Sequence, residues 1–226
     1  MIEIVTKHNS FLYADALQQM YRLRHRVFVE RLGWEDLRKP DGREIDQFDT
    51  EDAIYMILQD DDDRVVASQR FLPTLKPHVV ADVYPDLCDI RALPIGVHIY
   101  EVGRLCTDDA YLIRPKRLKA RAQIMVATME FALLAEIHQL TFIGSFDMLN
   151  LVLALGWNPT PLGIPRKIEG VNTGAFVLTV APESLASAQR HFGIFETVVR
   201  YLGPSPADAL MIDHLPIPEA EPFTKN

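Results

Sequence analysis

The sequence predicts an α/β (α+β) protein with a mixed, twisted sheet and helices on both faces. Two observations predict this class. Short apolar runs rich in β-branched residues predominate in the first half of the chain, and strand-like and helix-like segments alternate after them. The segment from residue 100 to residue 146 reads as strand, long helix, strand, and such a unit forms a parallel, right-handed crossover.

The first half contains one helix among strands. Residues 2–5 read as a short strand and residues 11–29 as an amphipathic helix. The runs 53–59 and 64–72 read as strands, and the acidic turn 60–63 between them predicts an antiparallel hairpin. A polar, irregular segment lies between the helix and the hairpin.

The second half alternates more regularly. A proline-bearing connection at 73–94 leads to an apolar strand at 99–107. The later elements are a long helix from Arg114 to about residue 139, a strand at 140–146, a short helix at 148–155, strands at 158–169 and 174–180, and a last helix at 182–192.

The length and composition indicate one globular unit. A chain of 226 residues with 48% hydrophobic and 24% charged residues can bury a substantial core. We expect a single domain over residues 1–202. Residues 203–226 are rich in proline and acids, so we expect them to form an extension outside it.

Charge and composition argue against nucleic-acid binding, a membrane span and a metal site. A net charge of −8 argues against nucleic acid as the main partner. No apolar run is long enough for a membrane span, and the N-terminus lacks a signal-peptide core, so we expect a cytoplasmic protein. The two cysteines, Cys88 and Cys106, and the seven histidines show no metal-ligand spacing, so we expect no metal site.

The strand at 99–107 carries two charges that need partners. Glu101 and Arg104 lie among apolar residues, where a charge is costly to bury unless it is paired. Residues three apart point to opposite faces of a regular strand. A shared site therefore requires a bulge, which we expect at Gly103. A structural ion pair on a half-exposed strand is the alternative interpretation.

Two further arginines interrupt apolar patterns. Arg24 lies on the apolar stripe of the first helix, and Arg70 lies inside the second hairpin strand. A snorkelling side chain is the alternative interpretation for Arg24. Buried guanidinium groups need acids, so we expect a buried network that comprises Arg24, Arg70, Arg104, Glu101, Asp46 and Asp49.

These residues resemble the signature of acyl-homoserine-lactone synthases, the autoinducer synthases of bacterial quorum sensing. The pattern is Leu23-Arg24-His-Arg-Val-Phe28, Arg31, Trp34, Glu44-x-Asp46-x-Phe48-Asp49, Arg70 and Glu101-x-x-Arg104. The resemblance extends over about residues 1–195. One departure is Asp36, two positions after the tryptophan, where the family often has an aliphatic residue.

The resemblance implies a fold and a reaction. The fold is similar to that of GNAT-type N-acyltransferases, in which two parallel strands diverge into a V-shaped cleft for an acyl thioester. S-adenosyl-methionine supplies the amine, and methylthioadenosine leaves after lactone closure. The acyl thioester and S-adenosyl-methionine are both substrates, so no further cofactor is expected. A plain GNAT protein has a glycine-rich pyrophosphate loop before the long helix, whereas residues 114–121 contain no glycine.

The resemblance also implies roles for the charged and aromatic residues. The catalytic pair is Glu101 and Arg104. The attacking amine has a free pKa near ~8 and must lose a proton, and we expect Glu101 to be the base. The expected S-adenosyl-methionine site comprises Phe28 and Trp34 for the sulfonium and adenosyl groups, Asp46 and Asp49 for the ammonium, and Arg24 and Arg104 for the carboxylate. Arg70 is expected to support the network.

The acyl chain is expected to lie between the two diverging strands and the long helix. The candidate lining residues are Met125, Met129, Phe142, Ser145 and Met148, for which core packing is the competing interpretation. Ser145 is included because similar enzymes often carry a hydroxyl there that reads the third carbon of the acyl chain.

Five cations at the start of the long helix suit a donor-docking surface. They are Arg114, Lys116, Arg117, Lys119 and Arg121. Such a cluster can bind an acidic acyl carrier protein or the phosphates of coenzyme A, and a solvated helix start is the alternative. Five cations exceed what coenzyme A needs, which slightly favours the carrier protein.

Two other functions stay open on the sequence alone. One is a GNAT-type N-acyltransferase that acts on another small amine. The other is a non-catalytic acyl-carrier or lipid-binding module. Release of methylthioadenosine from S-adenosyl-methionine and an acyl thioester distinguishes the three. The sequence does not select the length, branching, oxidation or aromaticity of the acyl group, or the oligomeric state.

Overall fold

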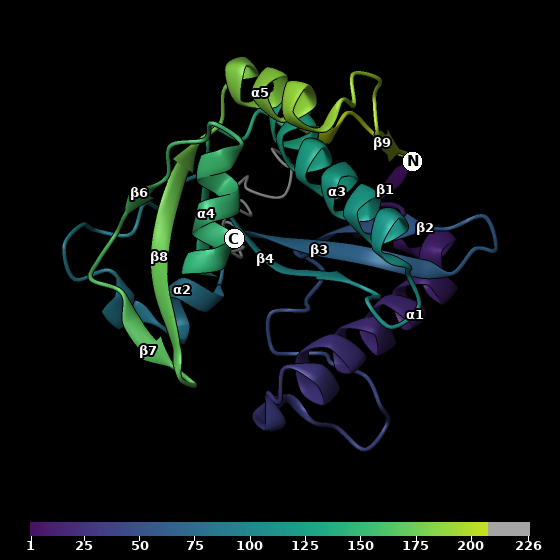
Figure 1. The fold of residues 1–226 in the computed structure, drawn as a ribbon, viewed down its shortest axis with the longest axis horizontal. Helices are drawn as coiled ribbons and strands as arrows, with labels where there is room; N and C mark the ends of the chain where they lie inside the picture. Colours follow the sequence, from purple (N-terminus) through teal and green to yellow (C-terminus); the bar gives the residue numbers. More distant parts are fainter. Residues whose placement is uncertain (208–226) are drawn as a thin grey trace, which may run out of the picture.

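A nine-stranded mixed sheet forms the centre of the computed structural model, which describes residues 1–207 (Figure 1). The strand order in this part of the chain is β6-β8-β5-β4-β3-β2-β1-β9, and β7 pairs with β8. The predicted α/β class is therefore confirmed. Residues 208–226 lie outside the described residues, so the predicted division into a domain at 1–202 and an extension at 203–226 stays a prediction.

The elements follow one another in a simple order. The strands are β1 (Ile2–Val5), β2 (Ile54–Gln59), β3 (Val65–Pro73), β4 (Ile99–Thr107), β5 (Gln139–Ser145), β6 (Thr160–Pro161), β7 (Arg166–Ile168), β8 (Val171–Thr179) and β9 (Val199–Tyr201). The helices are α1 (Ala14–Arg24), α2 (Val79–Asp82), α3 (Arg114–Leu134), α4 (Phe146–Ala154) and α5 (Pro182–Phe192). Short 3₁₀ turns occupy Ser10–Tyr13, Glu35–Leu37 and Pro85–Leu87, and a π-helical segment spans His25–Arg31.

Most predicted elements are confirmed, with differences at their ends. The hairpin β2–β3 is antiparallel, as predicted. The predicted helix at 11–29 is a 3₁₀ turn, α1 and the π-helical segment in succession. The long helix ends at Leu134 rather than near residue 139, because Glu136 adopts a positive φ of 53° and the chain turns into β5. The sequence missed β9, a three-residue strand parallel to β1.

Both faces of the sheet are covered. Ile54 and Met56 on β2 pack into one apolar cluster with residues of α3, while Tyr55 and Ile57 pack into another with residues of α1. Alternate residues of a strand point to opposite faces, so α1 and α3 lie on opposite sides of the sheet. No helix in residues 1–207 is long and apolar enough to cross a membrane.

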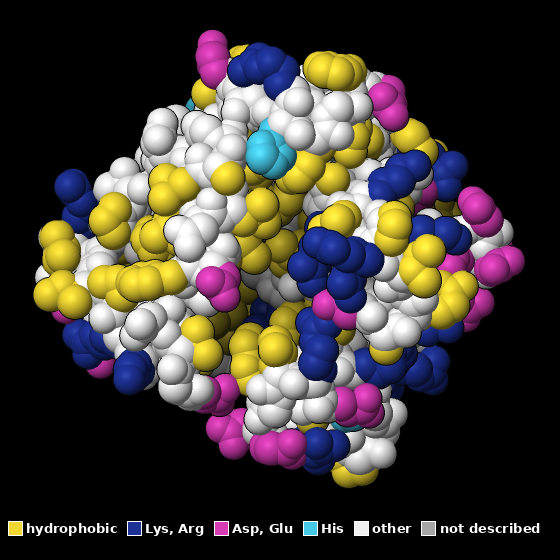
Figure 2. All heavy atoms as spheres, in the orientation of Figure 1, with side chains coloured by type: hydrophobic (Ala, Val, Ile, Leu, Met, Phe, Trp, Pro, Cys, Tyr) yellow, Lys and Arg dark blue, Asp and Glu magenta, His cyan; other side chains and the backbone are white. Residues whose placement is uncertain are grey.

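The parallel pair β4–β5 opens into a V. The strands pair at Ile99 with Gln139, Tyr100 with Leu140 and Glu101 with Thr141, and pairing then stops while both strands continue. Figure 2 shows the face that carries α3 and α4 hollowed at its centre, with hydrophobic side chains on the walls and Lys and Arg at one rim. Glu101 therefore marks the point at which the sheet splits.

Candidate active site

Three arginines and three acids form a closed ring of ion pairs. Each arginine bridges two acids and each acid bridges two arginines, in the order Arg24, Glu44, Arg104, Asp46, Arg70, Asp49 and back to Arg24. We call these six residues the charge ring. The network predicted among the three arginines, Asp46 and Asp49 is confirmed.

Each arginine has at least two good hydrogen bonds. Arg24 donates from Nη1 and Nη2 to Asp49 at 2.7 and 2.8 Å and from Nε to Glu44. Arg70 Nη1 lies 2.6 Å from Asp46 Oδ1 and 2.8 Å from Asp49 Oδ1. Arg104 Nη2 lies 3.1 Å from Glu44 Oε1 and 2.6 Å from Asp46 Oδ2. Bidentate contacts of this kind fix the orientation of each planar guanidinium.

The charge ring is balanced and largely buried. Arg24 and Arg70 are each 1% exposed, and the Glu44 side chain is fully buried. Burial alone would raise the pKa of Asp49, but the hydrogen bonds from Arg24 and the charges of Arg24 and Arg70 hold that pKa well below its usual range. The three positive and three negative charges compensate one another, which makes this burial tolerable.

Four elements bring the ring together. Arg24 ends α1, Arg70 lies in β3 and Arg104 lies in β4, while the three acids come from the irregular loop before β2. That loop is tied to α1 by the Glu44 N–H, which donates to the Tyr21 carbonyl at 3.0 Å. The sequence prediction missed Glu44 as a ring member, although it belongs to the same acidic cluster as Asp46 and Asp49.

The predicted bulge in β4 is present, but its special residue is Arg104. Between the pairs Ser68–Cys106 and Arg70–Gly103, β4 has one more residue than β3. Arg104 takes the left-handed conformation with φ of 51°, and Gly103 has no positive φ. Such a conformation costs a non-glycine residue about 1–3 kcal/mol. The bonds from Arg104 to Glu44 and Asp46 offset this strain.

The prediction that placed Glu101 in the ion-pair network is wrong. In the described part of the chain its Oε2 accepts the Val80 N–H at 2.7 Å, and no arginine forms an ion pair with it. The reason is that Glu101 lies at the apex of the V, whereas the bulge that places Arg104 in the charge ring comes later in β4.

Glu101 nevertheless has the environment of a base. It is buried, and this burial raises its pKa, while the Val80 N–H and the nearby charges of His78 and Arg70 oppose the shift. A carboxyl group with a raised pKa is a better proton acceptor from an amine than an ordinary surface glutamate.

An aromatic pair flanks the ring at Arg104. The rings of Phe28 and Trp34 stack with centroids 5.0 Å apart and an interplanar angle of 17°. The Arg104 Cζ lies 5.5 Å from the Phe28 centroid and 5.7 Å from that of Trp34. Trp34 is half-buried, and its backbone N–H donates to the Phe28 carbonyl at 2.9 Å, next to the π-helical segment. Such π segments often occur at functional sites.

The predicted acyl-pocket residues lie on the α3 side of the V. Met125, Met129 and Phe142 are buried in the core, and Met148 is partly buried against it. The Phe142 ring stacks on Phe176 with centroids 5.2 Å apart. The sequence missed two apolar residues of β4 that pack partly buried against the same core, Val102 and Leu105. A bulge interrupts the alternation of side chains between the two faces of a strand, so the sequence did not show which face Val102 and Leu105 occupy.

Ser145 has a local structural role. It caps the N-terminus of α4, where its Oγ accepts the Met148 N–H at 3.4 Å. A serine N-cap stabilises a helix by satisfying one of its free amides. Its predicted contact with the acyl chain stays a prediction.

The five cations at the start of α3 divide into two groups. Arg117 and Arg121 approach Asp109 at 3.9 and 2.9 Å, and Arg31 binds the same carboxylate. The other three, Arg114, Lys116 and Lys119, are exposed. Part of the apparent docking surface is therefore engaged within the protein.

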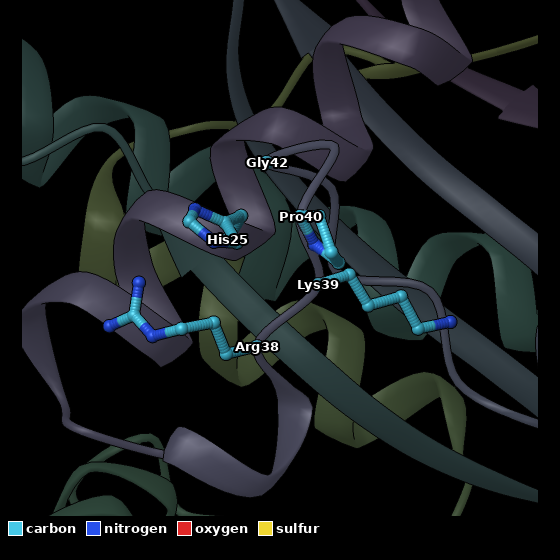
Figure 3. Close-up of a pocket in the computed structure, with 5 residues that line it drawn as sticks. All are labelled: His25, Arg38, Lys39, Pro40 and Gly42. Carbon is cyan, nitrogen blue, oxygen red and sulfur yellow. The ribbon is translucent and has the colours of Figure 1, made fainter.

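A separate pocket lies beside the π-helical segment, which contributes His25 to its lining. It has a volume of about 490 Å³ and is lined by His25, Arg38, Lys39, Pro40 and Gly42 (Figure 3). Its cations have partners, because Arg38 pairs with Glu35 and Lys39 donates to the Ile45 carbonyl. None of its lining residues belongs to the charge ring. Within residues 1–207 no group of three or more potential metal ligands occurs.

Comparisons with known proteins show which sequences and structures this chain is similar to. The autoinducer synthase family matches residues 8–187. An isovaleryl-homoserine lactone synthase of Bradyrhizobium diazoefficiens is 35% identical over 205 residues, which are 90% of each chain. The structure of BjaI, a CoA-dependent acyl-homoserine lactone synthase with SAM and isopentyl-CoA, matches with a TM-score of 0.84 and 33% identity over 94% of this chain and 99% of that one.

A more distant comparison supports the fold alone. An acyl-CoA N-acyltransferase of Pseudomonas aeruginosa matches with a TM-score of 0.50 and 15% identity, over 79% of this chain and 99% of that one. The predicted GNAT-like fold is thereby confirmed.

Proposed function

The chain belongs to the family of acyl-homoserine-lactone (autoinducer) synthases, which are acyltransferases, and from this premise we propose that it transfers a short acyl group from a coenzyme A thioester to the amine of S-adenosyl-methionine. Closure of the product then releases methylthioadenosine and an acyl-homoserine lactone. The observation that supports this best is the buried carboxylate of Glu101 at the point where β4 and β5 separate.

Glu101 is the proposed base. The amine of S-adenosyl-methionine is largely protonated near neutral pH and must lose a proton before it attacks the thioester. The raised pKa of Glu101 suits this transfer. Beyond Glu101 the β4 backbone is no longer paired with β5, and a free N–H of this stretch would stabilise the tetrahedral oxyanion.

The charge ring is proposed to hold the methionyl part of the substrate. Arg104 and Asp46 are its accessible members, with side chains 13% and 10% exposed, so we assign them to the carboxylate and the ammonium. Arg24, Asp49 and Arg70 are engaged inside the ring, and their role in binding is to orient these two residues.

The aromatic pair is proposed to bind the sulfonium and adenosyl groups. The Trp34 ring is the accessible one of the two, and the buried Phe28 ring stacks against it. Lactone closure needs the methionyl carboxylate to attack its own γ-carbon with loss of methylthioadenosine. The protein contributes chiefly by holding these atoms close together.

A coenzyme A donor is favoured over a carrier protein, contrary to the slight preference drawn from the sequence. The Bradyrhizobium relative is named for an isovaleryl product, and BjaI is described as CoA-dependent with isopentyl-CoA. The engagement of Arg117 and Arg121 by Asp109 removes two cations from the docking surface. The remaining three match the few close contacts that coenzyme A phosphates need.

Product analysis tests the proposal. The purified chain is incubated with S-adenosyl-methionine and with isovaleryl, butyryl or octanoyl thioesters of coenzyme A or acyl carrier protein. We expect methylthioadenosine and acyl-homoserine lactone from the short coenzyme A thioesters, and neither product from the Glu101→Gln variant. Release of coenzyme A without methylthioadenosine would indicate another amine acceptor. Turnover of carrier-linked substrates alone would refute the coenzyme A donor.

A further inference from the structure

Two consecutive acids directly after β4 bind the π-helical segment near both of its ends. The buried Asp108 accepts a hydrogen bond from Arg26 Nη2 at 2.8 Å, and Asp109 accepts one from Arg31 Nη1. Both arginines belong to the pattern that the sequence shares with autoinducer synthases, yet the proposed function gives neither of them a role. Their contacts tether the segment to the end of β4, the strand of the proposed base.

The tethered segment carries the aromatic pair. Phe28 lies between Arg26 and Arg31 in the chain, and its carbonyl accepts the Trp34 backbone N–H at 2.9 Å. A π-helical turn is rare, and helical stability in proteins comes mostly from tertiary packing. The positions of Phe28 and Trp34 relative to β4 therefore depend in part on the two ion pairs.

Asp109 also reaches the donor side of the molecule. Its Oδ2 lies 2.9 Å from Arg121 Nη2 on α3, and its Oδ1 accepts the Thr107 hydroxyl at 2.6 Å. Arg121 Nε in turn donates to the Thr107 oxygen at 3.2 Å, so these three side chains form a closed set of hydrogen bonds. The π-helical segment and α3 pack on opposite faces of the sheet. The Asp109 carboxylate therefore joins elements of both faces around the end of β4.

Three arginines share this one carboxylate. Arg31 and Arg121 form hydrogen bonds with Asp109, and Arg117 Nε approaches its Oδ1 at 3.9 Å. Partial burial would raise the pKa of Asp109, but the Thr107 hydroxyl and the neighbouring arginines hold that pKa below its usual value. The carboxylate is therefore ionised at neutral pH. Without its negative charge the guanidinium groups repel one another, and the contact between the π-helical segment and α3 is lost.

We propose that Asp109 is a positioning residue that aligns the Phe28–Trp34 aromatic pair with the donor helix α3 across the end of β4. This inference rests on the proposed function, in which S-adenosyl-methionine lies against the aromatic pair and the thioester lies beside α3. Asp109 contacts neither reacting atom and acts on the relative placement of the amine and the thioester carbon. A displacement of about 1 Å caused far from the chemistry can lower a rate about a hundred-fold.

The test uses Asp109→Asn, which keeps the size of the side chain and an acceptor for Thr107 but removes the charge. The matched control is Asp89→Asn, in a part of the chain outside the proposed site. Asp89 likewise pairs with an arginine, Arg166 at 3.1 Å, and accepts a second hydrogen bond, from the Ile164 N–H at 2.9 Å. Methylthioadenosine release is measured with saturating S-adenosyl-methionine and isovaleryl coenzyme A, and thermal unfolding is measured alongside.

We expect Asp109→Asn to lower kcat about ten-fold or more, because misplaced substrates react slowly even when both are bound. The KM of S-adenosyl-methionine should stay within about threefold, because the charge ring and the aromatic pair remain intact. The melting temperature should fall by no more than about 4 °C, because Arg31 and Arg121 are exposed. Asp89→Asn should turn over within about twofold of the parent.

Two more variants test whether the effect comes from the ion pair with Arg31. Asp109→Glu keeps the carboxylate and should retain a kcat within about threefold of the parent. Arg31→Met breaks the same contact from the other side. The kcat values of Arg31→Met, Asp109→Asn and the double variant should therefore lie within about threefold of one another.

Three results would overturn the inference. One is a kcat of Asp109→Asn within about threefold of the parent. Another is a loss of kcat that Asp89→Asn matches or that Asp109→Glu shares, which would indicate a general structural effect. The third is a double variant whose loss is the product of the two single losses, because the two residues would then act independently. If Asp109→Asn does not fold, Arg31→Met is measured in the same way. A parent protein that releases no methylthioadenosine would refute the proposed function itself.

Discussion

Replacement of Arg70 by methionine tests whether the charge ring stabilises the fold. Arg70 is 1% exposed and donates three hydrogen bonds of 2.6, 2.8 and 3.0 Å to Asp46 and Asp49. Without it, two arginines face three carboxylates in a buried site. Removal of one partner from a buried ion pair costs about 3–5 kcal/mol. We expect the free energy of unfolding to fall by this amount and the melting temperature by about 6–20 °C.

Thermal and urea unfolding at pH 7 measure the effect. The matched control is Arg64→Met, because Arg64 pairs with Asp108 at 2.9 Å but its side chain is 43% exposed. An exposed pair of this kind contributes only about 0–1 kcal/mol. Arg70→Met should also lose most of its activity, because Asp46 is no longer held in place.

The pH dependence gives a sharper check. The ring holds the pKa of Asp49 below its usual value. The stabilisation from this carboxyl is therefore present above the unfolded-state pKa of about 3.9 and is lost as the pH falls through the folded-state pKa. Without Arg70 the shift is smaller, so the stability difference between parent and variant should narrow below about pH 4. A variant that unfolds like the parent at pH 7, or a difference that does not change with pH, would refute the reasoning.

Three further predictions concern the substrates. Trp34→Ala should weaken binding of S-adenosyl-methionine by about five- to thirty-fold in calorimetry, because it removes roughly 1–2 kcal/mol of ring contacts. The KM of the acyl donor should stay unchanged. An affinity for S-adenosyl-methionine equal to that of the parent would count against the aromatic site. The pH profile of kcat/KM should have an acid limb above the usual glutamate pKa of about 4.3, because burial raises the pKa of Glu101, and a limb at or below that value would argue against Glu101 as the base. Gly144→Ala places a methyl group 3.3 Å from Met148 Cγ and 3.4 Å from a ring carbon of Phe142. It should lower kcat/KM for octanoyl relative to butyryl thioesters by about ten-fold, and an unchanged ratio would place the acyl chain elsewhere.

The sequence alone determined which residues carry unusual constraints. Arg24, Arg70, Glu101 and Arg104 interrupt apolar patterns, and the free energy of burying a charge predicts that each needs a partner. The strand–helix–strand pattern likewise predicts the parallel pair β4–β5, because the right-handed crossover is a local rule of chain connection.

Only the tertiary structure decided how these charges pair. Glu44 lies 20 residues from Arg24 and 60 from Arg104 along the chain, and no periodic pattern connects residues at such separations. The bulge was predictable from the spacing of Glu101 and Arg104, but its position was not. The strain at Arg104 is tolerated only because two acids from a distant loop receive its guanidinium.

The place of Glu101 was decided in the same way. Its hydrogen-bond partner is the backbone N–H of Val80, and backbone groups carry no signal in a sequence. Burial cost depends on residue type and can be read from the sequence, whereas the partner that relieves it depends on how distant segments pack, which only the folded chain specifies.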